Sequence, residues 1–269
     1  MHLSHLPKLA VSVVGLFLAA SMLAPLPYAV LEPGDGQDVL GSVIKISGQR
    51  TYPAHGKLLI TTVYVTSPGS VLFGVNILRS WMSGNSIVLP RSVLYAPNTS
   101  AKEIDAANLL EMVDSQQFAV AAALTYLNFP VTQQSVSDAG GVKTTKYIFP
   151  FPVSITLKDT GGPSGGLIFA LGIVEKLTPA DLLKGRVVAG TGTIDKAGHV
   201  GAIGGIGDKI IAAKRAGATV FLAPAANCTD IAQRPSGITV YSVETLAEAV
   251  ALLKDSKNAI PHCTWQRNR

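Results

Sequence analysis

The stretch KDTGGPSGGLIFALGIVEKL, residues 158–177, sets a serine among glycines directly ahead of a long apolar run. The proline before that serine suits the first turn of a helix, and the glycines permit tight backbone conformations. The apolar run is typical of a buried, central helix. Ser164 therefore has two interpretations. It either caps the amino terminus of this helix, or it is a nucleophile beside unpaired N–H groups that can hold an oxyanion.

A nucleophilic serine needs a neighbouring base that accepts its proton. Lys209 is a candidate because it lies between the glycine-rich GGIGD and the aliphatic IIAA. Burial in such surroundings disfavours the ammonium form and lowers the pKa of a lysine, which is what a general base requires. The alternative is an ordinary lysine whose stem covers apolar residues while its head reaches water.

Residues 162–166 also match G-x-S-x-G, the nucleophile turn of α/β-hydrolases. In that interpretation Asp181 or Asp195 supplies the acid and His199 or His262 supplies the base. The proline directly before the serine is unfavourable for the strained turn of that motif. A Ser–His–Asp esterase therefore stays open as an alternative enzyme class.

The rest of the chain alternates predicted strands and helices without a strict βαβ repeat, which favours an α+β or mixed α/β fold. Ser100 and Glu103 form a capping box at the start of the longest predicted helix, in which we expect a break near Asp114. Strands are expected at 57–65, 147–157, 185–194, 198–205, 218–224 and 238–243, and helices at 71–82, 101–127, 207–217 and 244–254. The segment 85–95 is expected to be extended, with its proline at a strand edge or end. Residues 133–146 are expected to form a polar loop or a hairpin tip.

Residues 9–31 carry no charge over 23 positions. A helix of that length crosses a hydrocarbon core about 30 Å thick. Because a lysine precedes the run and acidic residues follow it, residues 1–8 are expected in the cytoplasm and the remainder outside the cell membrane. A cleaved signal peptide is the alternative, although its apolar core is usually shorter. The sequence thus predicts one transmembrane signal-anchor, a domain over 32–254 and a polar tail over 255–269.

The overall composition argues against several classes of binding site. The net charge is +5, but the basic residues are scattered, which is unlike a nucleic-acid interface. No G-x-x-x-x-G-K-[ST] motif for ATP occurs, and no Cys or His spacing is typical of a metal site, so we expect neither cofactor nor metal. Outside the membrane, Cys228 and Cys263 can form a disulfide; the alternative is two separate thiols.

Three segments in order then carry a resemblance to a known family. DTGGPSGGLIFALGIVEKLTPADL, VVAGTGTID and GHVGAIGGIGDKIIAAKRAGATVFLAP resemble the proteolytic domain of Lon-type proteases, over at least residues 147–254. TYPAHGKLLITTVYV, VLPRSVLY and MVDSQQFAVAAAL are similar to the membrane-anchored, ATPase-free branch of Gram-positive bacteria. Members of that branch join an anchor to a PDZ domain and a Lon-type domain. Here only about 20 residues, 128–147, lie where the PDZ domain would stand.

The resemblance implies a Ser–Lys dyad. Ser164 matches the nucleophile, Lys209 the general base, and Thr191 a threonine that orients the lysine. We further expect backbone N–H groups near Gly162 and Ser164 to stabilise the oxyanion.

By the same resemblance, the protein would be a membrane-anchored serine endopeptidase that cleaves unfolded or exposed protein segments without ATP. Family analogy also suggests a homo-oligomer, a hexameric ring. A non-enzymatic alternative is a membrane-tethered binding module on a Lon-like fold.

Overall fold

The computed structural model describes residues 8–97, 99–137, 143–157, 160–231, 235–255 and 262–263. These residues form two compact units rather than the single domain expected over 32–254. The smaller unit takes in Met1–Pro33 and Tyr64–Ile104, and the larger unit takes in Gly34–Val63 and Asp105–Arg269. The sequence pattern missed this division because two long strands contribute residues to both units.

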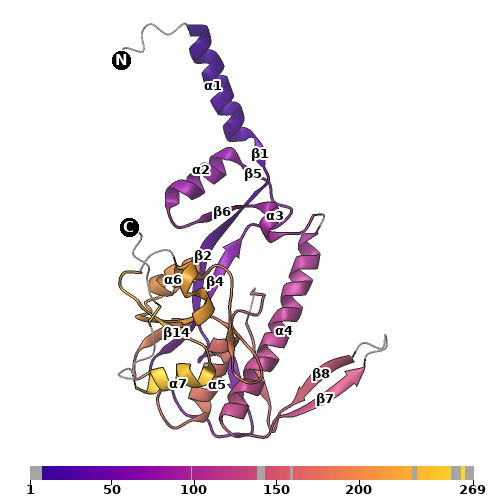
Figure 1. Ribbon diagram of the computed structural model, residues 1–269, viewed down its shortest axis with the longest axis vertical. Coiled ribbons are helices and arrows are strands. Elements are labelled where there is room, and N and C mark those ends of the chain that lie inside the picture. Colours follow the sequence, from indigo (N-terminus) through magenta and orange to yellow (C-terminus); the bar gives the residue numbers. More distant parts are fainter. Residues whose placement is uncertain are drawn as a thin grey trace. The chain divides into compact units, whose positions relative to one another are not determined.

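The smaller unit contains short elements around paired strands (Figure 1). Its elements are α1 (Lys8–Leu23), β1 (Pro25–Leu26), the first part of β2 (Tyr28–Asp38), the end of β4 (Lys57–Val65), β5 (Leu72–Phe73), α2 (Gly74–Ser83), β6 (Ile87–Pro90) and α3 (Arg91–Leu94). Strand β1 pairs with β5, and β2 pairs with β6, both antiparallel. The proline that was expected at a strand edge or end is the last residue of β6, but the segment after it is helical instead of extended.

The apolar amino-terminal run does not form the predicted helix over 9–31. Helix α1 ends at Leu23, and the residues after it enter β1 and β2. Prolines at 25 and 27 explain this end because their rings cannot continue a helix. Within β2, Ala29, Val30 and Leu31 are buried in the fold. None of the helices that the structure describes has both the length and the apolar character needed to span a membrane.

The larger unit is built on parallel strands in the order β14-β13-β10-β4, with β2 beyond β4. Strand β10 lies between β4 and β13, and all these neighbouring pairs up to β4 run parallel. The members not yet named are β10 (Val187–Gly190), β13 (Val220–Pro224) and β14 (Thr239–Val243). This observed sheet agrees with the predicted mixed α/β class.

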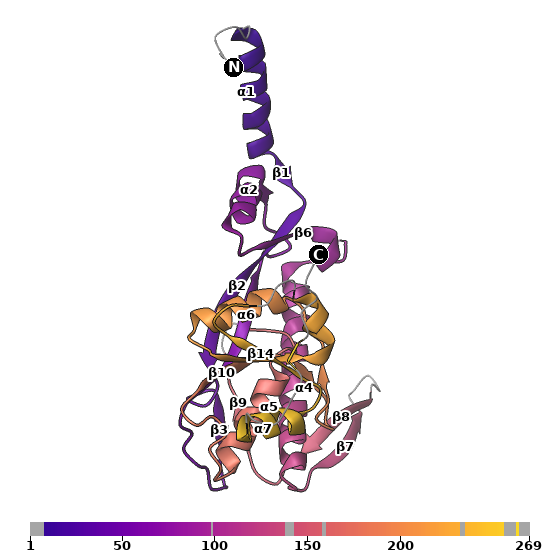
Figure 2. The same cartoon turned by 60° about the vertical axis from the view of Figure 1, so that its left-hand side comes forward.

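Alternating strand residues build two hydrophobic clusters, one on each face of the sheet. Ile60, Val188 and Leu222 pack with α5 (Gly166–Leu177) and α7 (Leu246–Lys254). Leu59, Ala189 and Phe221 instead pack with α6 (Ile206–Arg215). Helices α5 and α7 lie side by side in Figure 1 and Figure 2. The sheet therefore separates α5, which follows the serine motif, from α6, which carries the candidate lysine.

Helix α4 (Ala101–Tyr126) is continuous through the predicted break. The predicted capping box is confirmed, since the Ser100 N–H donates to the Glu103 carboxylate at 2.8 Å and the Glu103 N–H donates back to the serine hydroxyl at 3.3 Å. Asp114 is exposed, so it stays hydrated without ending the helix. Residues Ala119–Leu124 are all buried in the larger unit.

The remaining elements are short. They are β3 (Ile44–Ile46), β7 (Thr132–Ser137), β8 (Lys143–Ile148), β9 (Val153–Ile155), β11 (Thr193–Ile194), β12 (Val200–Gly201) and the 3₁₀ helix η2 (Ala225–Asp230). Strands β7 and β8 form an antiparallel hairpin, so much of the segment expected as a polar loop or hairpin tip over 133–146 is strand, and its residues 138–142 lie outside the described residues. Strand β9 pairs with β3, and the prolines ahead of it separate it from β8.

Candidate active site

The Ser164 backbone is held on the turn just ahead of α5. Its carbonyl accepts hydrogen bonds from the Gly192 N–H at 2.8 Å and from the Thr191 hydroxyl at 3.0 Å. Gly192 has φ of 154°, and a Cβ there would lie 2.7 Å from the side chain of Val200. Glycine suits this position because a larger residue would collide with β12 and rarely adopts this φ.

Lys209 reaches the same point from the other face of the sheet. Helix α6 begins after Gly205, whose φ of 69° is left-handed. The Lys209 Nζ lies 2.7 Å from the Ser164 Oγ and 3.1 Å from the Thr191 Oγ1. Thr191 donates its proton to the Ser164 carbonyl, so its oxygen is free to accept from the lysine. The structure thus brings together the three residues that the sequence comparison grouped.

The surroundings of Lys209 favour the neutral amine. The side chain is only 5% exposed. Burial lowers the pKa of Lys209 to about 8, because the interior removes water from the charged form. Near neutral pH the neutral amine is therefore a minor but accessible form, far more populated than in an exposed lysine, and it lies within hydrogen-bonding distance of a hydroxyl. This arrangement can transfer a proton from serine to lysine.

Helix α4 holds the segment that precedes the serine. The Gly162 N–H donates to the Asn108 carbonyl at 2.9 Å, and the Ser115 hydroxyl donates to the Pro163 carbonyl at 2.9 Å. Ser115 is 3% exposed. In a trans peptide, N–H and C=O point in opposite directions. Ser115 therefore aims the N–H of Ser164 away from α4.

These bonds correct the expected oxyanion donors. The N–H of Gly162 is already committed to a backbone carbonyl of α4, so it is not available to an oxyanion. Within the described part of the chain, no acceptor is recorded for the Ser164 N–H. Of the two predicted donors, the structure leaves only Ser164. Sequence reasoning also missed Ser115, although its spacing from Met112 and Ala119 puts this polar residue on the buried face of α4.

A comparison with known protein families matches residues 109–253 to the C-terminal proteolytic domain of Lon protease (S16). That match covers more than half of the chain. The chain belongs to the Lon protease family. The matched region of that family is its C-terminal proteolytic domain.

Individual relatives agree with the family. Lon protease 1 of Borreliella burgdorferi is 34% identical over 139 residues, which is 49% of this chain and 16% of that protein. Lon protease 2 of Herpetosiphon aurantiacus is 40% identical over 95 residues, 34% of this chain and 11% of that protein. The archaeal Lon protease of Methanocaldococcus jannaschii is 37% identical over 97 residues, 36% of this chain and 14% of that protein. The chain thus spans less than a fifth of these relatives.

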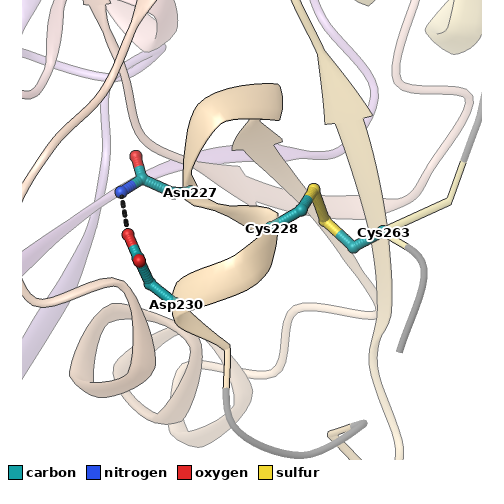
Figure 3. The surroundings of a disulfide bond; sticks show 4 residues. All are labelled: Asn227, Cys228, Asp230 and Cys263. Carbon is teal, nitrogen blue, oxygen red and sulfur yellow. Dashed lines mark hydrogen bonds between the residues drawn. A yellow bond between two sulfur atoms is a disulfide. The ribbon is translucent and has the colours of Figure 1, made fainter. Parts of the chain in front are cut away.

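A disulfide lies on η2, which contacts α6, the helix that carries Lys209. Figure 3 shows Cys228 on η2 bonded to Cys263, with a Cα–Cα distance of 5.1 Å. The neighbouring Asn227 accepts from the Ile203 N–H and donates to the Ile203 carbonyl, each at 2.9 Å. Ile203 precedes the left-handed Gly205 that starts α6. This side chain, which the sequence did not single out, therefore fixes the approach to Lys209.

The histidines of the esterase alternative lie elsewhere in the Lon domain. His199 pairs with Asp195 at 2.8 Å and lines a cavity of about 210 Å³ with α4 and α7. His262 stacks on Tyr241, and Asp181 lies 3.3 Å from His55. The hydroxyl of the serine is instead bonded to a lysine. The geometry therefore disfavours a Ser–His–Asp triad.

Metal ligation was not expected from the sequence. In the described ranges, three or more His, Cys, Asp or Glu side chains nowhere come close enough together to hold a metal ion.

Proposed function

We propose that this chain is a serine endopeptidase in which Ser164 is the nucleophile, Lys209 the general base and Thr191 the residue that orients the lysine. The observation that carries the proposal is the 2.7 Å separation between the Lys209 Nζ and the Ser164 Oγ, with the amine buried. Membership of the Lon protease family supports the same reaction class.

In the proposed reaction, the neutral Lys209 amine takes the hydroxyl proton as the Ser164 oxygen attacks a peptide carbonyl. The resulting oxyanion accepts a hydrogen bond from the Ser164 N–H, which Ser115 orients. The ammonium then returns its proton to the leaving amine, the C–N bond breaks, and an acyl-enzyme remains. The neutral lysine next activates a water molecule that hydrolyses the ester and restores the serine hydroxyl.

We propose unfolded or exposed protein segments as substrates, because a peptide must be extended to bring its carbonyl to a serine within a turn. The steps above move only protons and acyl groups, so cleavage itself requires no ATP. A homo-oligomeric ring, hexameric by analogy with the family, is part of the same proposal.

The proposed location is the outer side of the cell membrane. Two features support it. The disulfide between Cys228 and Cys263 is typical of oxidising compartments outside the cytoplasm. In addition, α1 has no buried residue and exposes large apolar side chains such as Leu16 and Phe17. In this proposal α1 contacts lipid and the larger unit faces the extracytoplasmic space.

The test compares wild-type protein with Ser164→Ala on an intrinsically unfolded protein substrate, with cleavage followed by mass spectrometry. Ser47→Ala, at an exposed serine elsewhere in the larger unit, is the matched control. We expect no cleavage and no labelling by a serine-directed phosphonate probe for Ser164→Ala, with both retained in the control. Cleavage by Ser164→Ala at the wild-type rate would reject the proposal. Lack of labelling and cleavage in wild-type protein would favour the non-catalytic binding module.

A further inference from the structure

Helix α2 of the smaller unit carries its apolar side chains outward. Val75, Leu78, Trp81 and Met82 are all exposed, and the last two are each 74% exposed. Their positions repeat every three or four residues, so they share one side of the helix. A helix of a water-soluble domain normally turns that side toward the core. Helix α2 does the opposite.

The polar side of α2 borders a cavity that is open to solvent, since Asn76, Arg79 and Ser83 are exposed. Asn76, Arg79, Ser80 and Ser83 line this cavity of about 660 Å³ in the smaller unit, together with residues of β2 and β4. The apolar side lies away from this cavity, and no part of the described smaller unit covers it.

Helix α1 meets the first turn of α2. A Cβ at Gly74 would lie only 2.2 Å from the Ser21 carbonyl oxygen, so the two helices are in backbone contact there. No residue of α1 is buried, and large apolar side chains cover most of its circumference. A protein partner covers one side of a helix, whereas a hydrocarbon phase surrounds it. The apolar surface that begins on α1 and continues onto α2 therefore fits lipid better than a protein groove.

We propose that the exposed side of α2, formed by Val75, Leu78, Trp81 and Met82, lies in the interface of a lipid bilayer that α1 enters. A short helix with one apolar side lies along such an interface, its apolar side chains reaching below the headgroups. Tryptophan favours this depth because its ring is amphipathic. The proposal rests on the proposed membrane location of α1 and does not depend on the proposed catalytic function.

The test uses the fluorescence of Trp81 in the full chain. The protein has two tryptophans, so Trp265→Phe leaves Trp81 as the only one. This variant is reconstituted into phosphatidylcholine vesicles, with and without lipids brominated just below the headgroup. We expect brominated lipid to lower the Trp81 emission at least about twofold. We also expect acrylamide in the water to quench Trp81 several-fold less than it does in the urea-unfolded protein.

A matched control moves the probe to an exposed apolar position of the larger unit. It combines Trp81→Phe and Trp265→Phe with Leu110→Trp, at a helix position that is 68% exposed. Its emission should be unchanged by brominated lipid. Two outcomes would overturn the proposal: Trp81 quenched freely by acrylamide but not by lipid, which places it in water, or protected from both, which means that protein covers it. Cleavage of an unfolded substrate by the same vesicles reports separately on the proposed function.

Discussion

The two units differ in which side chains they bury and which they expose. The larger unit buries Lys209, Asp208 and Glu175, each at most 5% exposed, while the smaller unit leaves Trp81 and Met82 largely in the open. The larger unit has a sheet covered by helices on both faces, so it has an interior that can perturb ionisable groups. The described part of the smaller unit has no such covered sheet, and many of its large apolar side chains stay exposed. The buried Lys209 belongs to the proposed active site of the larger unit, whereas the exposed apolar side of α2 belongs to the proposed membrane contact of the smaller unit.

Beside the loss expected for Ser164→Ala, replacing the buried lysine should give the largest effect in the larger unit. We expect Lys209→Met to lower the rate of peptide cleavage by more than about 1000-fold, because no base remains for the serine. Lys214→Met, at an exposed lysine on the same helix, is the control. Cleavage is measured as kcat/KM on a fluorogenic peptide. Activity of Lys209→Met within tenfold of the control would contradict the assignment.

The same lysine predicts two pH effects. Wild-type activity should rise as the amine loses its proton and level off above a pH of about 8, the pKa of Lys209. Below that pH the folded protein holds a buried ammonium that the unfolded chain exposes to water. Lys209→Met should therefore raise the free energy of unfolding at pH 7 by about 1 to 3 kcal/mol. This gain should disappear above about pH 10.5, where lysine is neutral in both states. Urea unfolding at the two pH values measures it.

Removing the disulfide should give the next largest effect, on the free energy of unfolding. The disulfide closes a loop of 35 residues, for which chain entropy predicts a loss of up to about 4 kcal/mol when the bond is removed. We expect Cys228→Ser combined with Cys263→Ser to lower the unfolding free energy of the larger unit. The Trp81 emission of the smaller unit should not change below that transition. Dithiothreitol should destabilise wild-type protein to the same extent and leave the double variant unaffected. Equal stability of wild-type and double variant would reject this structural role.

The hydroxyl that holds the serine turn should give the smallest effect. We expect Ser115→Ala to lower kcat about 10- to 100-fold with little change in KM, because the Ser164 N–H loses its orientation but substrate contacts remain. Titration with a serine-directed probe corrects for misfolded protein. Ser115→Thr should recover most of the rate, since it keeps the hydroxyl, and Glu111→Ala on the exposed side of α4 should have none of this effect. A parallel fall in titratable sites would show that Ser115 acts only in folding.

Much of the larger unit could be predicted from local sequence. The capping box at Ser100 and the strand over 57–65 depend on neighbouring residues, and both appear in the structure. The serine and the lysine could be singled out in the sequence because glycines and aliphatic residues flank them. Their catalytic roles stay predictions. By contrast, the assignment of Gly162 as an oxyanion donor was wrong, because its N–H is taken by a residue 54 positions earlier, Asn108.

The smaller unit was harder to predict because its structure also depends on contacts between residues far apart in the chain. The uncharged run over 9–31 suggested one membrane helix, but prolines end α1 at Leu23 and the rest of the run pairs in β2 with a distant strand. Hydropathy reports how apolar a segment is and carries no information on whether lipid or protein surrounds it. Likewise, only the structure shows that the apolar side of α2 stays exposed.

By itself, the sequence indicated the mixed α/β class and the position of the serine before a buried helix, and it offered Lys209, His199 and His262 as bases for that serine. These depend on residue type and short-range spacing. Only the tertiary structure decided which N–H groups face a substrate, what holds Lys209 in place, and which apolar residues stay outside. Those properties arise where segments far apart in the chain meet and compete for the same hydrogen bonds and the same buried volume.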